Sequence, residues 1–139
     1  MINKYPVKMI PYFADYIWGG IKLKEKWGKK TDTDTLAESW ELSAFKDKNS
    51  VAANGELKGK TLSEIINYWQ DAVGEKGKDY PFFPLLIKFI DASSNLSVQV
   101  HPDNEYALKN ENQFGKAEMW YVVDAEKGSG IYCGFKKEI

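Results

Sequence analysis

The chain has 139 residues, of which 43% are hydrophobic and 14% aromatic, enough for one globular domain with a core and unlike a disordered segment. Nineteen Lys and Arg residues nearly balance twenty Asp and Glu residues, and the net charge of −1 gives no overall field that would attract nucleic acid or an anionic membrane. The single cysteine, Cys133, excludes an intrachain disulfide, and no apolar run is long enough to span a membrane. Because the N-terminus lacks the apolar core of a signal peptide, we expect a cytoplasmic protein.

The first half of the chain predicts short strands, loops and turns. The first thirty residues are rich in aromatic side chains and contain a tight bend at Trp18-Gly-Gly20. Residues 37–45 predict a strand, and Trp40 within it is expected to anchor the N-terminal packing together with Trp18. In residues 51–57, Asn54-Gly55 is typical of a two-residue hairpin turn with positive φ.

A helix and a strand are expected next. Thr61 and Glu64 have the spacing of a capping box, and apolar residues then recur on one helical face until Gly74. Residues 85–90 predict a buried strand that is interrupted by one charge, Lys88.

The stretch Leu96-Ser-Val-Gln-Val-His101 alternates strictly between apolar and polar residues, which predicts a strand with one face in the core. Its other face carries Ser97, Gln99 and His101, the only histidine of the chain. A short helix over 102–109 and further strands over 115–123 and 131–135 are expected to follow. Many short strands with one or two helices favour a mainly β fold, a jelly roll or barrel-like sandwich.

Gln99, His101 and Glu118 form a candidate metal site. Gln99 and His101 leave the same strand face about 6.6 Å apart at the backbone, close enough to converge on one ion. An imidazole, a carboxylate and an amide oxygen suit a borderline divalent ion, of which zinc is the first expectation, and three protein ligands leave a position open for water or substrate. The alternative is that His101 merely precedes a proline at a strand end and that Glu118 is a solvated charge.

Two lysines are candidates for binding an anion. Lys88 lies in an apolar strand, where its ammonium group needs an anion, either a structural partner or a ligand. Lys116 shares the face of Glu118 and could approach an anionic ligand or be an exposed strand charge. Met119 and Trp120 are expected in the core or in the lining of a pocket, and Cys133 is expected to be a small buried residue.

Several of these strings occur together in a known family. FPLLIKFIDA, LSVQVHPDNEYA and GKAEMWYVVDA, with YIWGG and AESWELS before them, resemble the type I mannose-6-phosphate isomerases, particularly the short bacterial form. The resemblance runs through essentially the whole chain and implies a cupin-type jelly roll, one zinc ion, and interconversion of mannose 6-phosphate and fructose 6-phosphate by proton transfer between C1 and C2.

The resemblance also implies roles for single residues. Gln99, His101 and Glu118 match the family's zinc ligands, and Ser97, Lys88 and Lys116 match positions that line its sugar-phosphate pocket. A cation that polarises the sugar carbonyl makes the adjacent C–H more acidic, and a positioned acid–base group can then move the proton. The identity of that acid–base group is left open.

Members of the family are longer, and the resemblance implies a second zinc-binding histidine and a catalytic arginine beyond Ile139. We therefore expect residues 1–139 to be a single N-terminal portion of the enzyme, without the C-terminal half, with an incomplete jelly roll and doubtful activity alone. A non-catalytic cupin-like module that binds a metal or a sugar is the alternative. The expected partner is a sugar phosphate rather than nucleic acid or a membrane, and uncovered strands could also allow self-association.

Overall fold

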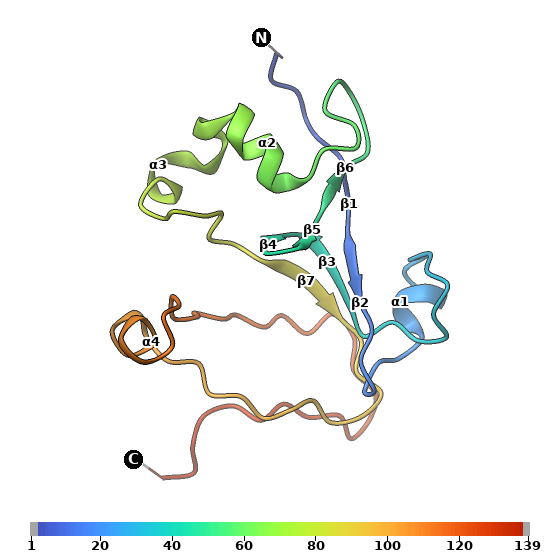
Figure 1. Ribbon diagram of the computed structural model, residues 1–139. Coiled ribbons are helices and arrows are strands. Elements are labelled where there is room, and N and C mark those ends of the chain that lie inside the picture. Colours follow the sequence, from blue (N-terminus) through green and yellow to red (C-terminus); the bar gives the residue numbers. More distant parts are fainter. Residues whose placement is uncertain (1–2, 138–139) are drawn as a thin grey trace. The chain divides into compact units, whose positions relative to one another are not determined.

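The computed structural model describes residues 3–137 and shows small sheets with a few short helices, which confirms the mainly β class (Figure 1). The chain divides into two compact units, with the boundary after Leu96. No helix within the described residues is long and apolar enough to cross a membrane.

The first unit holds all the strands that the structure assigns within residues 3–137. They are β1 (Met9–Ile10), β2 (Tyr12–Ala14), β3 (Glu38–Leu42), β4 (Ala44–Phe45), β5 (Lys48–Asn49), β6 (Val51–Ala52) and β7 (Ile87–Ile90). Every strand pair is antiparallel: β2-β3-β7 form one sheet, while β1-β6 and β4-β5 form two-stranded ribbons. The strand predicted over 37–45 is therefore present, as β3 and β4 with Ser43 between them.

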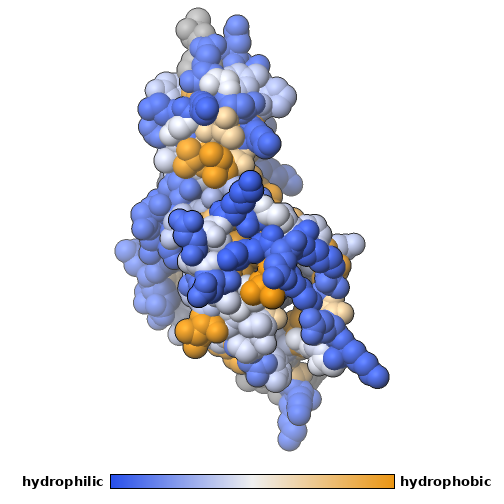
Figure 2. Space-filling view, turned by 90° about the vertical axis from the view of Figure 1, so that its right-hand side faces the viewer, coloured by the Kyte–Doolittle hydropathy of each residue, from blue (hydrophilic) through white to orange (hydrophobic). Residues whose placement is uncertain are grey.

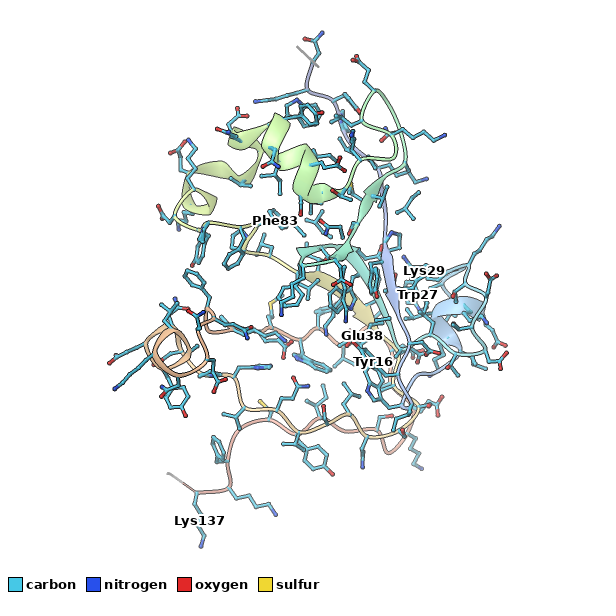
Figure 3. The ribbon with its side chains drawn as sticks, in the orientation of Figure 1. Tyr16, Trp27, Lys29, Glu38, Phe83 and Lys137 are labelled. Atoms are coloured by element: carbon cyan, nitrogen blue, oxygen red, sulfur yellow. The ribbon has the colours of Figure 1, made fainter. Side chains whose placement is uncertain are left out.

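Both faces of the central strand β3 are covered. One face carries Glu38 and Trp40, both buried, and Trp40 packs against the ring of Tyr12. On the other face the ring of Phe89 stacks on that of Trp27, with ring centroids 5.8 Å apart. Trp27 follows helix α1 (Lys22–Glu25), and Figure 3 shows it on the α1 side of the sheet. Side chains on both faces thus hold β3 in place.

A charged pair joins β3 to β7. Trp40 and Lys88 are register partners, and the Lys88 ammonium lies 2.8 Å from Oε1 of Glu38. The Glu38 side chain is only 6% exposed and that of Lys88 19%. Because a buried carboxylate is costly without a partner, this pair fixes the relation between the two strands.

Asp91, directly after β7, caps helix α1 from a distance of about seventy positions in the chain. Its Oδ2 accepts the backbone N–H groups of Lys22 (2.6 Å) and Leu23 (3.3 Å). Gly20 lies so close that a Cβ atom there would be 2.5 Å from the same oxygen. A side chain at position 20 of the Trp18-Gly-Gly20 bend would therefore have to displace the Asp91 carboxylate, which bonds to the N-terminus of α1.

Helix α2 (Leu62–Tyr68) begins as predicted and ends earlier. Thr61 accepts a hydrogen bond from the Glu64 N–H, and Oε2 of Glu64 accepts one from the Thr61 N–H, which completes the capping box. Ile65 packs into a core cluster with Ala52 and Leu57. The remainder of the predicted helix is a 3₁₀ turn, η1 (Gln70–Val73), followed by the short helix α3 (Gly74–Gly77).

The second unit contains helix α4 (Asn104–Asn110). Asp103 caps the N-terminus of this helix, because its side chain accepts a hydrogen bond from the Tyr106 N–H. This confirms the predicted short helix. The predicted strands over 96–101, 115–123 and 131–135 are wrong as strands, since the structure assigns no ladder there. Val98 and Val100 are 81% and 76% exposed, so the apolar face of 96–101 is not in the core. Alternation marks a potential face, but a strand also needs a hydrogen-bonded neighbour and a covering layer.

Other local predictions also need correction. In β7, Lys88 and Ile90 are half-buried whereas Ile87 and Phe89 are more exposed, so the strand is not buried on both faces. Gly55 has the expected positive φ (65°), but it lies in a longer loop that closes where Ala52 bonds to Gly59 and Lys60, not in a two-residue turn.

Three residues that were expected in the core or in a pocket lining lie at the surface instead. Met119 is 88% exposed and Cys133 is also exposed, and Trp120 is 48% exposed. Their predicted burial depended on the strands over 115–123 and 131–135, which do not form. On the face drawn in Figure 2, hydrophobic residues appear as small separate groups among hydrophilic ones.

The capping box predicts a pH dependence of stability. The Thr61 backbone N–H, then the Lys60 ammonium, lower the pKa of Glu64 to about 2 from 4.5. Because this pKa is lower in the folded state, the stabilisation is present above about pH 4.5 and is lost as the pH falls toward 2. We expect the difference in urea midpoint between wild type and Glu64→Gln to shrink between pH 6 and pH 3. Glu56→Gln, which removes a carboxylate from a loop, controls for the change in net charge. An equal difference in urea midpoint at pH 6 and pH 3 would show that the capping box is not the source of the pH dependence.

The Glu38–Lys88 ion pair predicts that removing a buried ammonium group lowers stability more than removing an exposed one. Lys88→Met leaves the Glu38 carboxylate buried without its ammonium partner, so we expect a loss of about 3 kcal/mol in the free energy of unfolding. Lys78→Met, which removes an exposed ion pair with Glu75, is the matched control and should change stability much less. Urea denaturation at neutral pH measures both, and equal effects would show that the Glu38–Lys88 pair is not buried in solution.

Candidate functional site

The second unit brings His101 and Glu118 together. Nε2 of His101 lies 3.3 Å from Oε2 of Glu118, and each side chain is 26% exposed. The backbone explains this meeting: the Lys116 N–H donates to the carbonyl of Pro102, and the Gly115 N–H to Oδ1 of Asn104. The two segments are thereby tied side by side just next to the imidazole and the carboxylate.

Glycine is required where these segments touch. A Cβ atom at Gly115 would lie 2.5 Å from the backbone of Pro102 and Asp103. Real Cβ atoms do not approach backbone that closely, so a larger residue would push the Glu118 segment away from His101. The sequence motif GKAE thus contributes both the close approach and the carboxylate.

Glu118 is held as an anion. Burial raises its pKa, but hydrogen bonds from the side chains of Lys116 and Trp120 and the nearby charges outweigh this effect and lower the pKa to about 2. The Lys116 ammonium is 2.8 Å from Oε1, on the other oxygen from His101. At neutral pH the site therefore offers a carboxylate beside an imidazole, the protonation state that metal ligation requires of a carboxylate.

The remaining polar residues of this segment contact each other. Nε2 of Gln99 donates to Oγ of Ser97 at 3.0 Å. With its NH₂ group so engaged, the amide oxygen is the end of Gln99 that a cation would take. Within residues 3–137 no group of three or more His, Cys, Asp and Glu residues is close enough to hold a metal ion, so any third protein ligand beside His101 and Glu118 has to be of another type, such as this amide.

Lys88 lies in the first unit, paired with Glu38 as described above. Two roles were predicted for Lys88, a structural ion pair and the binding of an anionic ligand. The structure supplies the ion-pair partner, Glu38, and the binding of a ligand stays a prediction. Glu38 also accepts the indole N–H of Trp40 on Oε2 at 2.7 Å. Sequence reasoning missed Glu38, although a carboxylate two residues from Trp40 on the same face of a predicted strand was a signal that it needs a partner.

Two surface hollows in the described part of the chain are not lined by these residues. One of about 500 Å³ is lined by Asp15 to Trp18 and Thr35, and another of about 380 Å³ lies along α4. Both are wide open to solvent, and neither is lined by His101 or Glu118. We therefore base the candidate site on the converging side chains, not on a hollow.

Comparison with solved structures bears on the fold. The chain superposes on the crystal structure of the mannose 6-phosphate isomerase from Bacillus subtilis with a TM-score of 0.81 and 37% sequence identity, over 89% of this chain and 39% of that one. At this similarity the two share a fold, which confirms the mainly β jelly roll of the cupin type.

Comparison with known sequences gives the family. The chain is 42% identical over 118 residues to the mannose-6-phosphate isomerase of Streptococcus mutans, covering 85% of this chain and 37% of that protein. It is 40% identical over 130 residues to the mannose-6-phosphate isomerase ManA of Bacillus subtilis, covering 93% and 40%. The chain thus spans about two fifths of the length of these relatives. Residues 7–134 match the model of the phosphomannose isomerase type I catalytic domain, and the chain belongs to that family.

Proposed function

We propose that the protein acts in the zinc-dependent interconversion of mannose 6-phosphate and fructose 6-phosphate. Family membership and the names of the relatives support this reaction. The observation that carries the proposal for this chain is the meeting of His101 and Glu118, with Lys116 on the other carboxylate oxygen. The cytoplasm remains the expected compartment.

The donor set fits a zinc ion. An imidazole nitrogen, an ionised carboxylate and the amide oxygen of Gln99 are nitrogen and oxygen ligands of the kind that zinc accepts. We propose that these three residues hold the metal. When bound, zinc would supply a positive charge that polarises the oxygens of the sugar or organises the pocket around them.

The lysines and Ser97 are proposed to bind the substrate. Lys116 is 43% exposed in its side chain, so its ammonium can offer hydrogen bonds to a phosphate as well as to Glu118. In the second unit, Ser97 offers a hydroxyl that accepts a hydrogen bond from Gln99. Lys88, in the first unit, is proposed separately to bind an anionic ligand through the ammonium that also pairs with Glu38. We assign no residue to the proton transfer between C1 and C2.

A non-catalytic module that binds a metal or a sugar phosphate remains the second candidate function. It needs only the ligand pair His101 and Glu118, which can bind a metal without any acid–base residue. The two functions share the same ligands and differ in turnover. The experiments below separate them.

Zinc affinity should depend on His101 and Glu118 more than on Gln99, because imidazole and carboxylate ligands bind the ion more strongly than a neutral amide. We expect His101→Ala and Glu118→Ala to weaken zinc binding more than tenfold and Gln99→Ala to weaken it less. Competition with a chromogenic chelator measures the three affinities, and Glu105→Ala, an exposed carboxylate of α4, is the control. Wild-type zinc retention in both His101→Ala and Glu118→Ala would remove the proposed site.

Lys116→Met should lower the affinity for mannose 6-phosphate, because it removes an ammonium donor to the phosphate, while neutral mannose binds weakly to wild type and variant alike. Titration calorimetry gives the affinities, and ³¹P NMR of the same samples reports conversion to fructose 6-phosphate. Zinc-dependent conversion that Glu118→Ala abolishes supports the isomerase. Tight binding of the sugar phosphate without conversion would favour the binding module, and equal affinity for mannose and its phosphate would contradict both lysine assignments.

A further inference from the structure

We infer that Trp40 is a positioning residue for Lys88, and that it acts through the Glu38 carboxylate. The inference rests on the proposed function, in which the Lys88 ammonium binds an anionic sugar. Trp40 itself is only 6% exposed and does not need to touch the substrate. Its effect is to decide how many hydrogen bonds Lys88 has left to give.

The three side chains form one connected group on one face of the β2-β3-β7 sheet. Trp40 and Glu38 are two residues apart on β3, and Lys88 is the register partner of Trp40 on β7. Nε1 of Trp40 donates to Oε2 of Glu38 at 2.7 Å, and Lys88 donates to Oε1 at 2.8 Å. The Lys88 ammonium also lies 5.9 Å from the centre of the indole ring, within cation–π range.

The indole divides the carboxylate between two donors. An ammonium has three N–H donors, and the bond to Oε1 uses one of them. Because the indole N–H already donates to Oε2 of Glu38, the Lys88 ammonium needs to donate only to Oε1. It therefore keeps donors for another anion, which is what a phosphate-binding lysine requires.

Burial makes this division depend on Trp40. Glu38 is 5% exposed, so water cannot easily replace a donor that Oε2 loses, and an unsatisfied charged oxygen is costly. The nearest ammonium to that carboxylate is Lys88. Without the indole N–H, Lys88 would be drawn across both oxygens and would offer less to a ligand.

Two variants remove the N–H and differ in shape. Trp40→Phe keeps an aromatic ring at the position but is smaller. Replacement of Trp40 by 3-benzothienylalanine exchanges only the N–H for sulfur and keeps the size of the indole. Lys48→Met is the matched control, because the Lys48 ammonium lies 5.1 Å from the same ring centre and its loss leaves the Trp40–Glu38 bond intact. Thermal melting of each variant shows that it folds.

The first measurement is the rate at which acetic anhydride labels each lysine of the full chain, read by mass spectrometry. We expect Lys88 to label severalfold more slowly in both Trp40 variants, while Lys109 on α4 labels as in wild type and Lys48→Met leaves Lys88 unchanged. General loosening of the fold would instead speed the labelling of Lys88. An unchanged or faster rate in the benzothienyl variant would overturn the inference.

The second measurement is affinity for mannose 6-phosphate. A hydrogen bond to a charged group is worth enough that its loss should weaken binding about tenfold, with the weak binding of mannose unchanged. A wild-type affinity in the benzothienyl variant would also overturn the inference. If wild type itself does not prefer the phosphate, the proposed function fails, and the labelling rates still decide whether Trp40 positions Lys88.

Discussion

The first unit depends on the satisfaction of one buried carboxylate. Glu38 lies in the central strand of the sheet with an indole N–H on one oxygen and an ammonium group on the other. Trp40 lies two residues from Glu38 on β3 and Lys88 is its register partner on β7, so the ion pair favours this pairing of β3 with β7. A slip of one residue between the two strands would carry Glu38 and Trp40 together to the face opposite Lys88 and break the ion pair. The Glu38 carboxylate therefore constrains both the pairing of β3 with β7 and the position of the Lys88 ammonium.

An irregularity in β3 lies directly beside this group. The register with β7 shifts between Trp40 and Leu42, and the Ser50 hydroxyl lies within hydrogen-bond distance of the carbonyls of Trp40 and Glu41 there. Ser50 is fully buried and also accepts the Ser43 N–H. One small side chain thus lies within hydrogen-bond distance of three backbone groups beside the shift. The shift comes just before the β4-β5 ribbon, which begins at Ala44.

Features set by neighbouring residues were predictable from the sequence, and those set by distant pairing were not. Thr61 with Glu64, and Asp103 before α4, announce helix starts because capping is local. The meeting of His101 with Glu118 was anticipated from residue types and family resemblance, but the expected strand over 96–101 was wrong, since alternation alone supplies no ladder partner. The partner of Lys88 depends on the β3–β7 register, which no periodicity reveals. Glu38 was missed although its place two residues from Trp40, on the same face of a predicted strand, was a local signal.

The cap of helix α1 also has a consequence for the order of folding. Four residues are far too few for a helix to persist alone, and its first N–H groups are satisfied by Asp91, which comes from the far end of β7. During synthesis on the ribosome, the first helix in the sequence would therefore be among the last elements of this unit to form. Its cap can form only after about seventy further residues have been synthesised and β7 has paired with β3.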